Sequence, residues 1–381
     1  MALFAEVHLI QNFAPSNLNR DDTGAPKDAI FGGVRRARIS SQCLKRSVRL
    51  DFKREALLPP ETIGTRTKKL VEELLRRLPE DRRADGEARI RVALSAAGLA
   101  VDDKGKTQYL LFLGEREIAG LAELVLTNWD ALGSIAAPVG AEKKAKKDAK
   151  AAVPKEIVDA ATTILDAPGA ADLALFGRML ADLPKYNVDA ACQVAHAIST
   201  HKVEREFDYF TAVDDLGAED ETGAGMIGTV EFNSACFYRY AAVDIAKLAS
   251  NLQGDLEMAS AAIQAFIRAT VNAIPSGKQN TFAAHNPPDL VAVALRRRAP
   301  RNLANAFEVP VSARRDEGLT TQSVRRLSDY ERRLSGAYGA AESWLVLDTA
   351  GAWPDDLGTR LPTLDALVAD AAQRITELHG A

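Results

Sequence analysis

The chain has 381 residues, of which 47% are hydrophobic and 26% are charged, and its formal net charge is −4. This is the composition of a globular protein with enough apolar side chains for a core. It contains no run of about 18 uncharged apolar residues that could span a membrane. The first residues also lack the basic region and cleavage site of a signal peptide. We therefore expect a cytoplasmic protein without a membrane segment.

The cysteines and histidines are too scattered to form a disulfide framework or a zinc site. Cys43, Cys192 and Cys236 lie far apart, and the chain contains no CxxC pair. Only His196 and His201 are close in sequence, and their spacing of five residues is poor for two ligands on one helix face. We expect no metal and no cofactor.

The first predicted strand covers residues 3–11, where apolar and polar residues alternate. Residues 14–40 are rich in Pro, Gly, Asn and Asp and predict a long structured loop. Ser40 or Ser41 then provides an N-cap for a helix over residues 42–58.

Basic residues concentrate in this loop and helix. Residues 20–54 contain ten basic and four acidic side chains, a local balance of +6 in an acidic chain. Lys45 and Arg49 share a helix face, and Gly32 and Gly33 permit close backbone approach. Cationic groups, serine hydroxyls and a helix N-terminus all suit phosphate, so the region predicts a nucleic-acid interface, with a solvated basic helix as the alternative. The ten basic residues are Arg20, Lys27, Arg35, Arg36, Arg38, Lys45, Arg46, Arg49, Lys53 and Arg54.

Residues 60–190 are helical in character, with amphipathic segments at 67–78, 117–129 and 155–165. An Ala/Lys-rich stretch at 137–153 has no apolar periodicity and is bracketed by prolines. It predicts an exposed linker. Contact of its five lysines with nucleic acid is the less favoured interpretation.

After residue 190, two extended segments flank a Gly-rich, acidic tip at residues 217–228, a pattern that predicts a protruding hairpin. The second segment continues as a strand over residues 229–245. A helix at 260–274, an apolar strand at 290–295 and a closing helix at 361–379 follow. This order predicts an α+β fold interrupted by an inserted helical lobe.

Motifs of catalysis are missing from the sequence. It contains no GxSxG, no GxxxxGK[ST], no HExxH and no closely spaced acidic metal cluster. Asp214 and Asp215 are paired carboxylates, but adjacent residues generally point apart, so a turn or a helix cap is the simpler interpretation. A general acid/base role of His201 in RNA cleavage remains the enzymatic alternative.

Several blocks of the chain, in one order, resemble the CasC family (Cse-type), the guide-RNA-binding backbone subunit of type I-E CRISPR Cascade. The blocks are NRDDTGAPKDAIFGGVRRARISSQCLKRSVR, LFGRM, AHAISTHKVEREFDYFTAVDDL, GTVEFNSACFYRYA, KQNTFAAHNPPDLV and NLANAFE. Together they span most of the chain. The stretch at 137–153 and the acidic tip depart from the family pattern.

The resemblance implies an α+β fold shaped like a right hand. An RNA-recognition-motif-like (ferredoxin-like) palm is expected at residues 1–58 and 231–381, helical fingers at 59–190 and a protruding thumb at 191–230. In this family about six copies polymerise along the crRNA with other Cascade subunits. They kink the guide at regular intervals and present it for pairing with target DNA. The type I-E form does not cut RNA, so Asp214 and Asp215 should be inert.

The resemblance also implies roles for single residues. Phosphate contacts are expected around the start of the first helix, an apolar contact near the kink from Met179, and a wedge from the thumb residues Phe210, Thr211 and Ile227. Lys278 and Gln279 are expected in a second palm loop that faces RNA. The full predicted RNA-binding set is Arg20, Lys27, Arg38, Ser40, Ser41, Gln42, Lys45, Arg46, Arg49, Met179, Phe210, Thr211, Ile227, Lys278 and Gln279. The alternatives are a repeat-RNA-processing endoribonuclease and a scaffold without nucleic acid.

Overall fold

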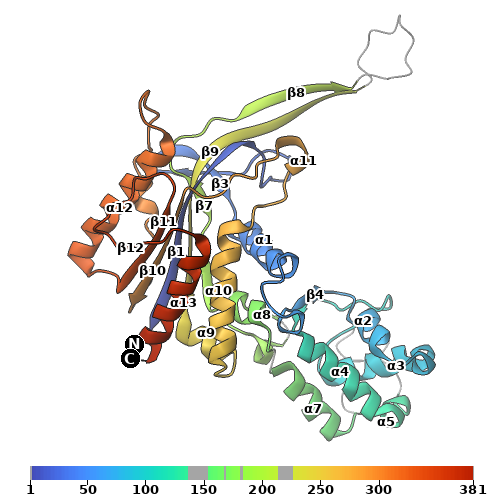
Figure 1. Ribbon diagram of the computed structural model, residues 1–381. Helices are drawn as coiled ribbons and strands as arrows, with labels where there is room; N and C mark the ends of the chain where they lie inside the picture. Colours follow the sequence, from blue (N-terminus) through green and yellow to red (C-terminus); the bar gives the residue numbers. More distant parts are fainter. Residues whose placement is uncertain (1, 136–152, 167–168, 181–182, 213–225, 381) are drawn as a thin grey trace, which may run out of the picture. The chain divides into compact units, whose positions relative to one another are not determined.

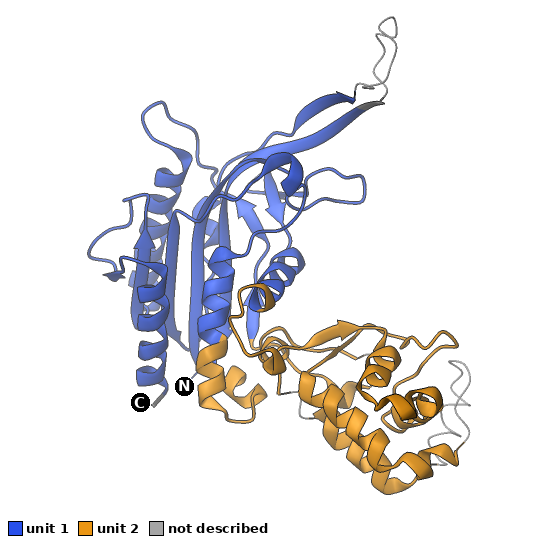
Figure 2. Cartoon of the chain, turned by 45° about the vertical axis from the view of Figure 1, so that its right-hand side comes forward, with its two compact units in different colours: residues 1–52, 192–246, 263–381 blue, residues 53–191, 247–262 orange. Residues whose placement is uncertain are grey.

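The structure is a computed structural model that describes residues 2–135, 153–166, 169–180, 183–212 and 226–380. The predicted linker at 137–153 and most of the predicted acidic tip therefore lie outside the described residues. The chain forms two compact units (Figure 2). Unit 1 comprises Met1–Phe52, Cys192–Ala246 and Ile263–Ala381, and unit 2 comprises Lys53–Ala191 and Lys247–Ala262.

Unit 1 is built on a large mixed sheet (Figure 1). Its strands are β1 (Leu3–Ser16), β2 (Asp28–Phe31), β3 (Val34–Ile39), β6 (Cys192–Val194), β7 (Ala197–Ser199), β8 (Glu206–Ala212), β9 (Met226–Asp244), β10 (Leu290–Arg297), β11 (Ser343–Asp348) and β12 (Thr359–Arg360). Its helices are α1 (Ser41–Arg54), α10 (Leu256–Asn272), α11 (Gln279–Phe282), η3 (Ala304–Phe307), α12 (Leu319–Tyr338) and α13 (Leu364–Gly380), of which α1 and α10 extend into unit 2.

The strand order is β12-β11-β10-β1-β9-β7-β3-β2, and β6 and β8 also pair with β9. Each of the central strands β10, β1, β9 and β7 is antiparallel to its neighbour in this order. In sequence, α1 lies between β1 and β7, and α10 lies between β9 and β10. This is the βαββαβ order of a ferredoxin-like domain, which confirms the predicted α+β fold with an RNA-recognition-motif-like palm.

Helices cover both faces of this sheet. Neighbouring residues of a strand point to opposite faces of the sheet. In β10, Arg296 contacts Glu331 of α12 at 3.1 Å, and the next residue, Arg297, donates to a backbone carbonyl of α13 at 2.9 Å. Arg239 of β9 donates to a carbonyl of α10 at 2.7 Å, and α10 lies with α13 across one face (Figure 1). RNA-recognition motifs bind RNA on the sheet itself. Here α12 and η3 pack on the second face, so that surface is not open to RNA.

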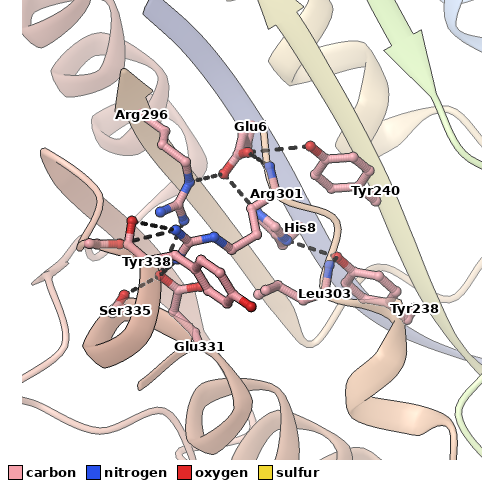
Figure 3. A network of polar contacts seen from close by, with 11 residues as sticks. Glu6, His8, Tyr238, Tyr240, Arg296, Arg301, Leu303, Glu331, Ser335 and Tyr338 are labelled. Atoms are coloured by element: carbon pink, nitrogen blue, oxygen red, sulfur yellow. Dashed lines mark hydrogen bonds and ion pairs between the residues drawn. The ribbon is translucent and has the colours of Figure 1, made fainter. Parts of the chain in front are cut away.

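A network of buried charges lies beneath α12 (Figure 3). Glu6 and His8 occupy the polar positions of the predicted alternation, and both are fully buried because α12 covers their face. Arg296 lies between Glu6 and Glu331, with distances of 3.1 Å to each carboxylate. Tyr240 donates a hydrogen bond to Glu6 at 3.3 Å. The network joins Glu6, His8, Tyr238, Tyr240, Arg296, Arg301, Leu303, Glu331 and Ser335.

The protonation of Glu6 reflects this environment. Burial alone raises the pKa of the Glu6 carboxyl, but its contacts with His8, Arg296 and the backbone N–H of Arg301 outweigh burial, and the net pKa lies below its ordinary value. The carboxylate is therefore the form that stabilises the fold. Its contribution is present above the pKa of the unfolded chain and is lost as the pH falls through the lower folded value.

Residues 28–39 differ from the predicted loop. β2 and β3 form a hairpin, in which Asp28 pairs with Ala37 and Phe31 with Val34. The turn residues Gly32 and Gly33 both have positive φ, at 59° and 76°, as a two-residue hairpin turn requires. The predicted helix also ends at Arg54 rather than at residue 58, and α12 and β11 were not predicted at all.

Unit 2 is mainly helical, as its amphipathic segments predict. Its elements are η1 (Pro60–Thr62), β4 (Thr65–Thr67), α2 (Leu70–Arg77), α3 (Glu80–Ala96), β5 (Leu111–Leu113), α4 (Glu115–Thr127), α5 (Trp129–Gly133), α7 (Lys155–Asp166), α8 (Ala171–Phe176), η2 (Pro184–Tyr186) and α9 (Ile245–Asn251). Leu74, Ile90 and Val125 belong to its apolar core. Among the described residues of the chain, no helix is long and apolar enough to cross a membrane.

Glu331→Gln should destabilise the protein by about 1–3 kcal/mol, because it removes one of the two carboxylate partners of the buried Arg296 guanidinium. Chemical unfolding measures the change. Asp356→Asn is the matched control, since Asp356 pairs with Arg332 at the surface and an exposed pair contributes at most about 1 kcal/mol. Equal effects of the two substitutions would contradict a stabilising role of the buried network.

Candidate nucleic-acid interface

The start of α1 is held by capping contacts. Ser40 is the N-cap, because its Oγ accepts a hydrogen bond from the N–H of Cys43 at 3.3 Å. The N–H of Ser41 donates to His196 Nδ1 at 2.8 Å, and the N–H of Ser40 donates to Asn19 Oδ1 at 2.8 Å. Internal partners therefore occupy the N–H groups of Ser41 and Cys43, and phosphate binding at this helix start stays a prediction.

Cationic side chains without acidic partners surround this helix start. Within the described part of the chain, none of the following five residues forms an ion pair, and we call them the cationic patch: Arg20, Lys27, Arg38, Lys45 and Arg46. All five belong to the predicted RNA-binding set. The buried Nε of Arg38 also has no acceptor among the described residues.

Three cations of the patch, Lys27, Arg38 and Arg46, act on the pKa values of neighbouring groups. Burial lowers the pKa of His196, and the positive charges of Arg38 and Lys27 lower it further. Burial raises the pKa of the Cys43 thiol, while Arg46 and Lys27 oppose that rise. Lys27 thus acts on both groups. The carbonyl of Lys27 accepts the N–H of Arg38 at 2.9 Å, which aligns the backbones of these two residues.

Other arginines of the basic segment have structural roles. Arg36 is fully buried and donates to the carbonyls of Phe31, Ser199, Phe307 and Glu308. Arg35 forms an ion pair with Asp28.

Arg49, a predicted contact, is half-buried and already interacts within the chain. Arg36 cannot join the predicted phosphate site, because it is fully buried and carbonyls occupy its guanidinium group.

The second predicted palm loop lies against the segment before Arg20. A Cβ on Gly277 would lie 2.4 Å from the carbonyl oxygen of Leu18, so only glycine fits there. Residues 18–24 and Gly277 line a hollow of about 530 Å³. Gln279 donates to the carbonyl of Pro275 at 3.0 Å and stabilises the loop, whereas Lys278 is half-buried at its left-handed turn.

The predicted thumb is a two-stranded ribbon formed by β8 and the first part of β9 (Figure 1). All residues of β8 are exposed. Phe210 pairs with Gly228, and its ring occupies the space where a side chain would stand on that glycine. Thr211 pairs with Ile227. Since neighbouring strand residues point to opposite faces, Phe210 and Thr211 lie on different sides of the ribbon.

Two exposed aromatic residues of the ribbon were missed by the sequence analysis. Phe207 is 66% exposed and Tyr209 is 62% exposed, and both share the face of Thr211. Base stacking on exposed aromatic rings is a common mode of RNA binding. Aromatic residues at alternate positions of the predicted strand were the signal for this face.

In unit 2, Met179 is 84% exposed. Its neighbour Arg178 is buried, pairs with Glu117 at 2.6 Å and donates to the carbonyl of Tyr186. Burial raises the pKa of Glu117 although Arg178 opposes that change. The anchored Arg178 therefore holds the adjacent Met179 at the surface, where a flexible thioether suits contact with base faces.

His201 is engaged by backbone groups on both sides of its ring. Its Nδ1 lies 2.7 Å from the carbonyl oxygen of Lys202, and its Nε2 accepts the N–H of Cys236 at 3.2 Å. Burial lowers the pKa of His201. Neither nitrogen is free to exchange a proton with a substrate in this arrangement.

The pKa of His196 provides a direct test of the cationic patch. Arg38→Ala should raise this pKa, because the substitution removes a positive charge that disfavours the imidazolium, and bound phosphate should raise it by the same physics. NMR titration of the His196 ring measures both shifts. Arg325→Ala, on α12, is the control and should leave the value unchanged. A His196 pKa that neither Arg38→Ala nor RNA alters would contradict the patch as described.

Comparison with known proteins agrees with this geometry. One similar chain comes from a solved structure titled "CRISPR RNA-guided surveillance complex, pre-nicking". It is 31% identical with a TM-score of 0.78, and the match covers 97% of this chain and 100% of that chain. A second comes from a "CRISPR RNA-guided surveillance complex", with 27% identity, a TM-score of 0.60 and coverage of 97% of this chain and 99% of that chain. No curated protein matches. The family described as CT1975-like protein (Cas_CT1975) matches residues 5–370, and the chain belongs to this family.

Proposed function

We propose that this protein is a guide-RNA-binding backbone subunit of a type I-E Cascade complex in the cytoplasm. About six copies line one crRNA, hold its phosphates, kink it at regular intervals and present it for pairing with target DNA. Family membership and the full-length similarity to chains of RNA-guided surveillance complexes support a role in such a complex. The sequence resemblance to the CasC family supports the type I-E assignment.

The cationic patch carries the proposal. An acidic chain keeps five cations without acidic partners around one helix start, while other surface arginines, such as Arg332 and Arg374, pair with carboxylates. Unpaired cations attract phosphates, and such contacts read no sequence. A guide-binding protein needs this property, because the spacer of a guide differs from one complex to the next and base pairing supplies the specificity.

The ribbon supports the proposed kinking of the guide. Phosphate contacts alone would leave the bases continuously stacked. The β8–β9 ribbon offers aromatic side chains on both faces, with Phe210 on one side and Phe207 and Tyr209 on the other. An apolar side chain that enters a base step replaces the stacking it interrupts. We assign this role to Phe210, with Thr211 on the opposite side of the same ribbon and Ile227 as the strand partner of Thr211.

We propose that the protein is not an enzyme. The alternative, an endoribonuclease that uses His201, is disfavoured by the two backbone contacts that engage its ring. Asp214 and Asp215 lie outside the described residues, and we expect them to be inert. His201→Ala should therefore leave repeat RNA uncleaved, as the unaltered protein does.

Lys45→Ala with Arg46→Ala should weaken RNA binding about tenfold at moderate salt, equally for unrelated guide sequences. Each phosphate contact to a single strand contributes about 0.7 to the slope of log K against log salt. The double variant should therefore lower that slope by about 1.4. Fluorescence anisotropy at four salt concentrations measures both quantities.

The matched control removes two cations that are already paired, by Arg268→Ala with Arg332→Ala. These arginines pair with Asp365 and Asp356 and lie outside the cationic patch. The control has the same change of net charge, so it should retain the slope of the unaltered protein. Equal slopes for both double variants would refute the patch as the phosphate site.

Phe210→Ala should spare the affinity and its salt slope but remove the regular pattern of exposed nucleotides in the bound guide. The reason is that Phe210 acts on base stacking and not on phosphate. Chemical probing of the bound RNA, nucleotide by nucleotide, measures the pattern. Tyr209→Ala tests the opposite face of the ribbon. A pattern lost in Tyr209→Ala and kept in Phe210→Ala would reverse the assignment of the two faces.

A further inference from the structure

One fully buried amide connects the loop that carries Arg20 with the ribbon. Asn17 is 1% exposed and directly follows the last residue of β1. Its Nδ2 donates to the carbonyl of Gly24 at 3.0 Å and to the carbonyl of Glu231, in β9, at 2.8 Å. Gly24 lies 7 residues away from Asn17 in sequence and Glu231 lies 214 residues away. A single side chain therefore bonds to a local loop and to a distant strand.

Residues 18–27, which we call the Arg20 loop, keep their own shape without Asn17. A backbone bridge between Arg20 and Pro26 closes the loop. Inside it, Asp21 Oδ1 accepts two backbone N–H groups, at 2.9 and 3.1 Å. Because these bonds hold the loop together, the bonds of Asn17 fix where the loop lies against the ribbon.

Two other contacts support the base of the ribbon. Arg205, just before β8, pairs with Asp28 at 2.8 Å and with Glu231 at 3.1 Å, but its side chain remains 30% exposed. Ion pairs open to solvent contribute little. The ring of Phe232 contacts that of Phe282, in α11, at 5.5 Å. Neither contact includes a residue of the Arg20 loop, whereas Asn17 bonds to the loop and the ribbon at once.

The two donors of Asn17 explain why an amide occupies this position. Its Oδ1 has no hydrogen-bond partner among the described residues, and a buried polar atom without a partner destabilises a fold. The favourable contribution therefore comes from the two N–H groups. These groups bond close to the residue that we assign to the kink, because Phe210 pairs with Gly228 in the same strand as Glu231.

We propose that Asn17 is a positioning residue, which fixes the ribbon relative to the Arg20 loop and so determines which nucleotide of the guide is displaced. This inference rests on the proposed function, in which Arg20 holds a phosphate and Phe210 enters a base step. A site whose supporting contacts are loose loses its geometry even when its own residues are present. Loss of the amide should therefore leave phosphate binding intact and make the kinks irregular.

Asn17→Ala and Asn17→Leu test the inference. The first removes the amide, and the second removes it but keeps a side chain of similar size. Both variants should retain the affinity for RNA and its salt slope, while the contrast between exposed and protected nucleotides of the bound guide falls about fivefold. Chemical probing of the bound RNA measures this contrast. In a chain that already carries Phe210→Ala, Asn17→Ala should add nothing, because both residues act on the same step.

Asn251→Ala is the matched control. The Nδ2 of Asn251 also donates to two backbone carbonyls, those of Ala174 at 2.9 Å and Asp189 at 2.8 Å, all within unit 2. The control therefore removes the same kind of bonds and should retain the contrast. An equal loss of contrast in Asn251→Ala would reduce Asn17 to a structural role and overturn the inference. A contrast that both Asn17 variants keep would overturn it as well.

Hydrogen exchange without RNA separates this inference from the proposed function. Asn17→Ala should speed the exchange of the backbone amides at residues 228–232 about tenfold, because local opening becomes easier when a supporting contact is lost. Asn251→Ala should leave this exchange unchanged. The proposed kinking fails if the unaltered protein shows no regular pattern on bound RNA. The exchange then decides the inference alone, and an unchanged rate in Asn17→Ala overturns it.

Discussion

The 19 residues of β9, Met226–Asp244, belong to two structures at once. From Asn233 onward the strand pairs with β1 in the middle of the sheet, and before that it pairs with β8 in the ribbon. An isolated two-stranded hairpin is only marginally stable in water. Because the ribbon continues a central strand, the sheet supports it and sets its direction. The ribbon and the β3 strand that leads to the cationic patch therefore belong to one sheet.

The same sheet explains why the proposed RNA site lies at its edge. α12 and η3 cover the face on which RNA-recognition motifs stack bases, and the buried pairs of Arg296 with Glu6 and Glu331 hold α12 there. The cationic patch lies where β3 runs into α1. Arg36, buried among four carbonyls, fastens the β2–β3 hairpin at this edge. Arg36 thus has a structural role, whereas Arg38, two residues later, belongs to the cationic patch.

Much of the fold could be predicted from the sequence, because periodicity shows β1, α1 and the helices of unit 2, and the family blocks indicate the site. The hairpin at residues 28–39 was missed because the pair Gly32–Gly33 is a hairpin signal only when its flanks are recognised as strands. The burial of Glu6 could not be predicted, because the alternation of strand residues does not show that α12, Leu319–Tyr338, packs on this face. Likewise, charge alone cannot distinguish Arg36, whose guanidinium donates to carbonyls, from Arg38, whose guanidinium has no carbonyl partner among the described residues.

The central claim is that this protein holds guide RNA through the start of α1 and the β8–β9 ribbon. Cross-linking the assembled complex to its RNA, followed by mass spectrometry of the cross-linked peptides, tests that claim most directly. The account predicts cross-links at Lys27 and Lys45 and in β8, with none in α12. Cross-links confined to α12, or a complex purified without RNA, would contradict it.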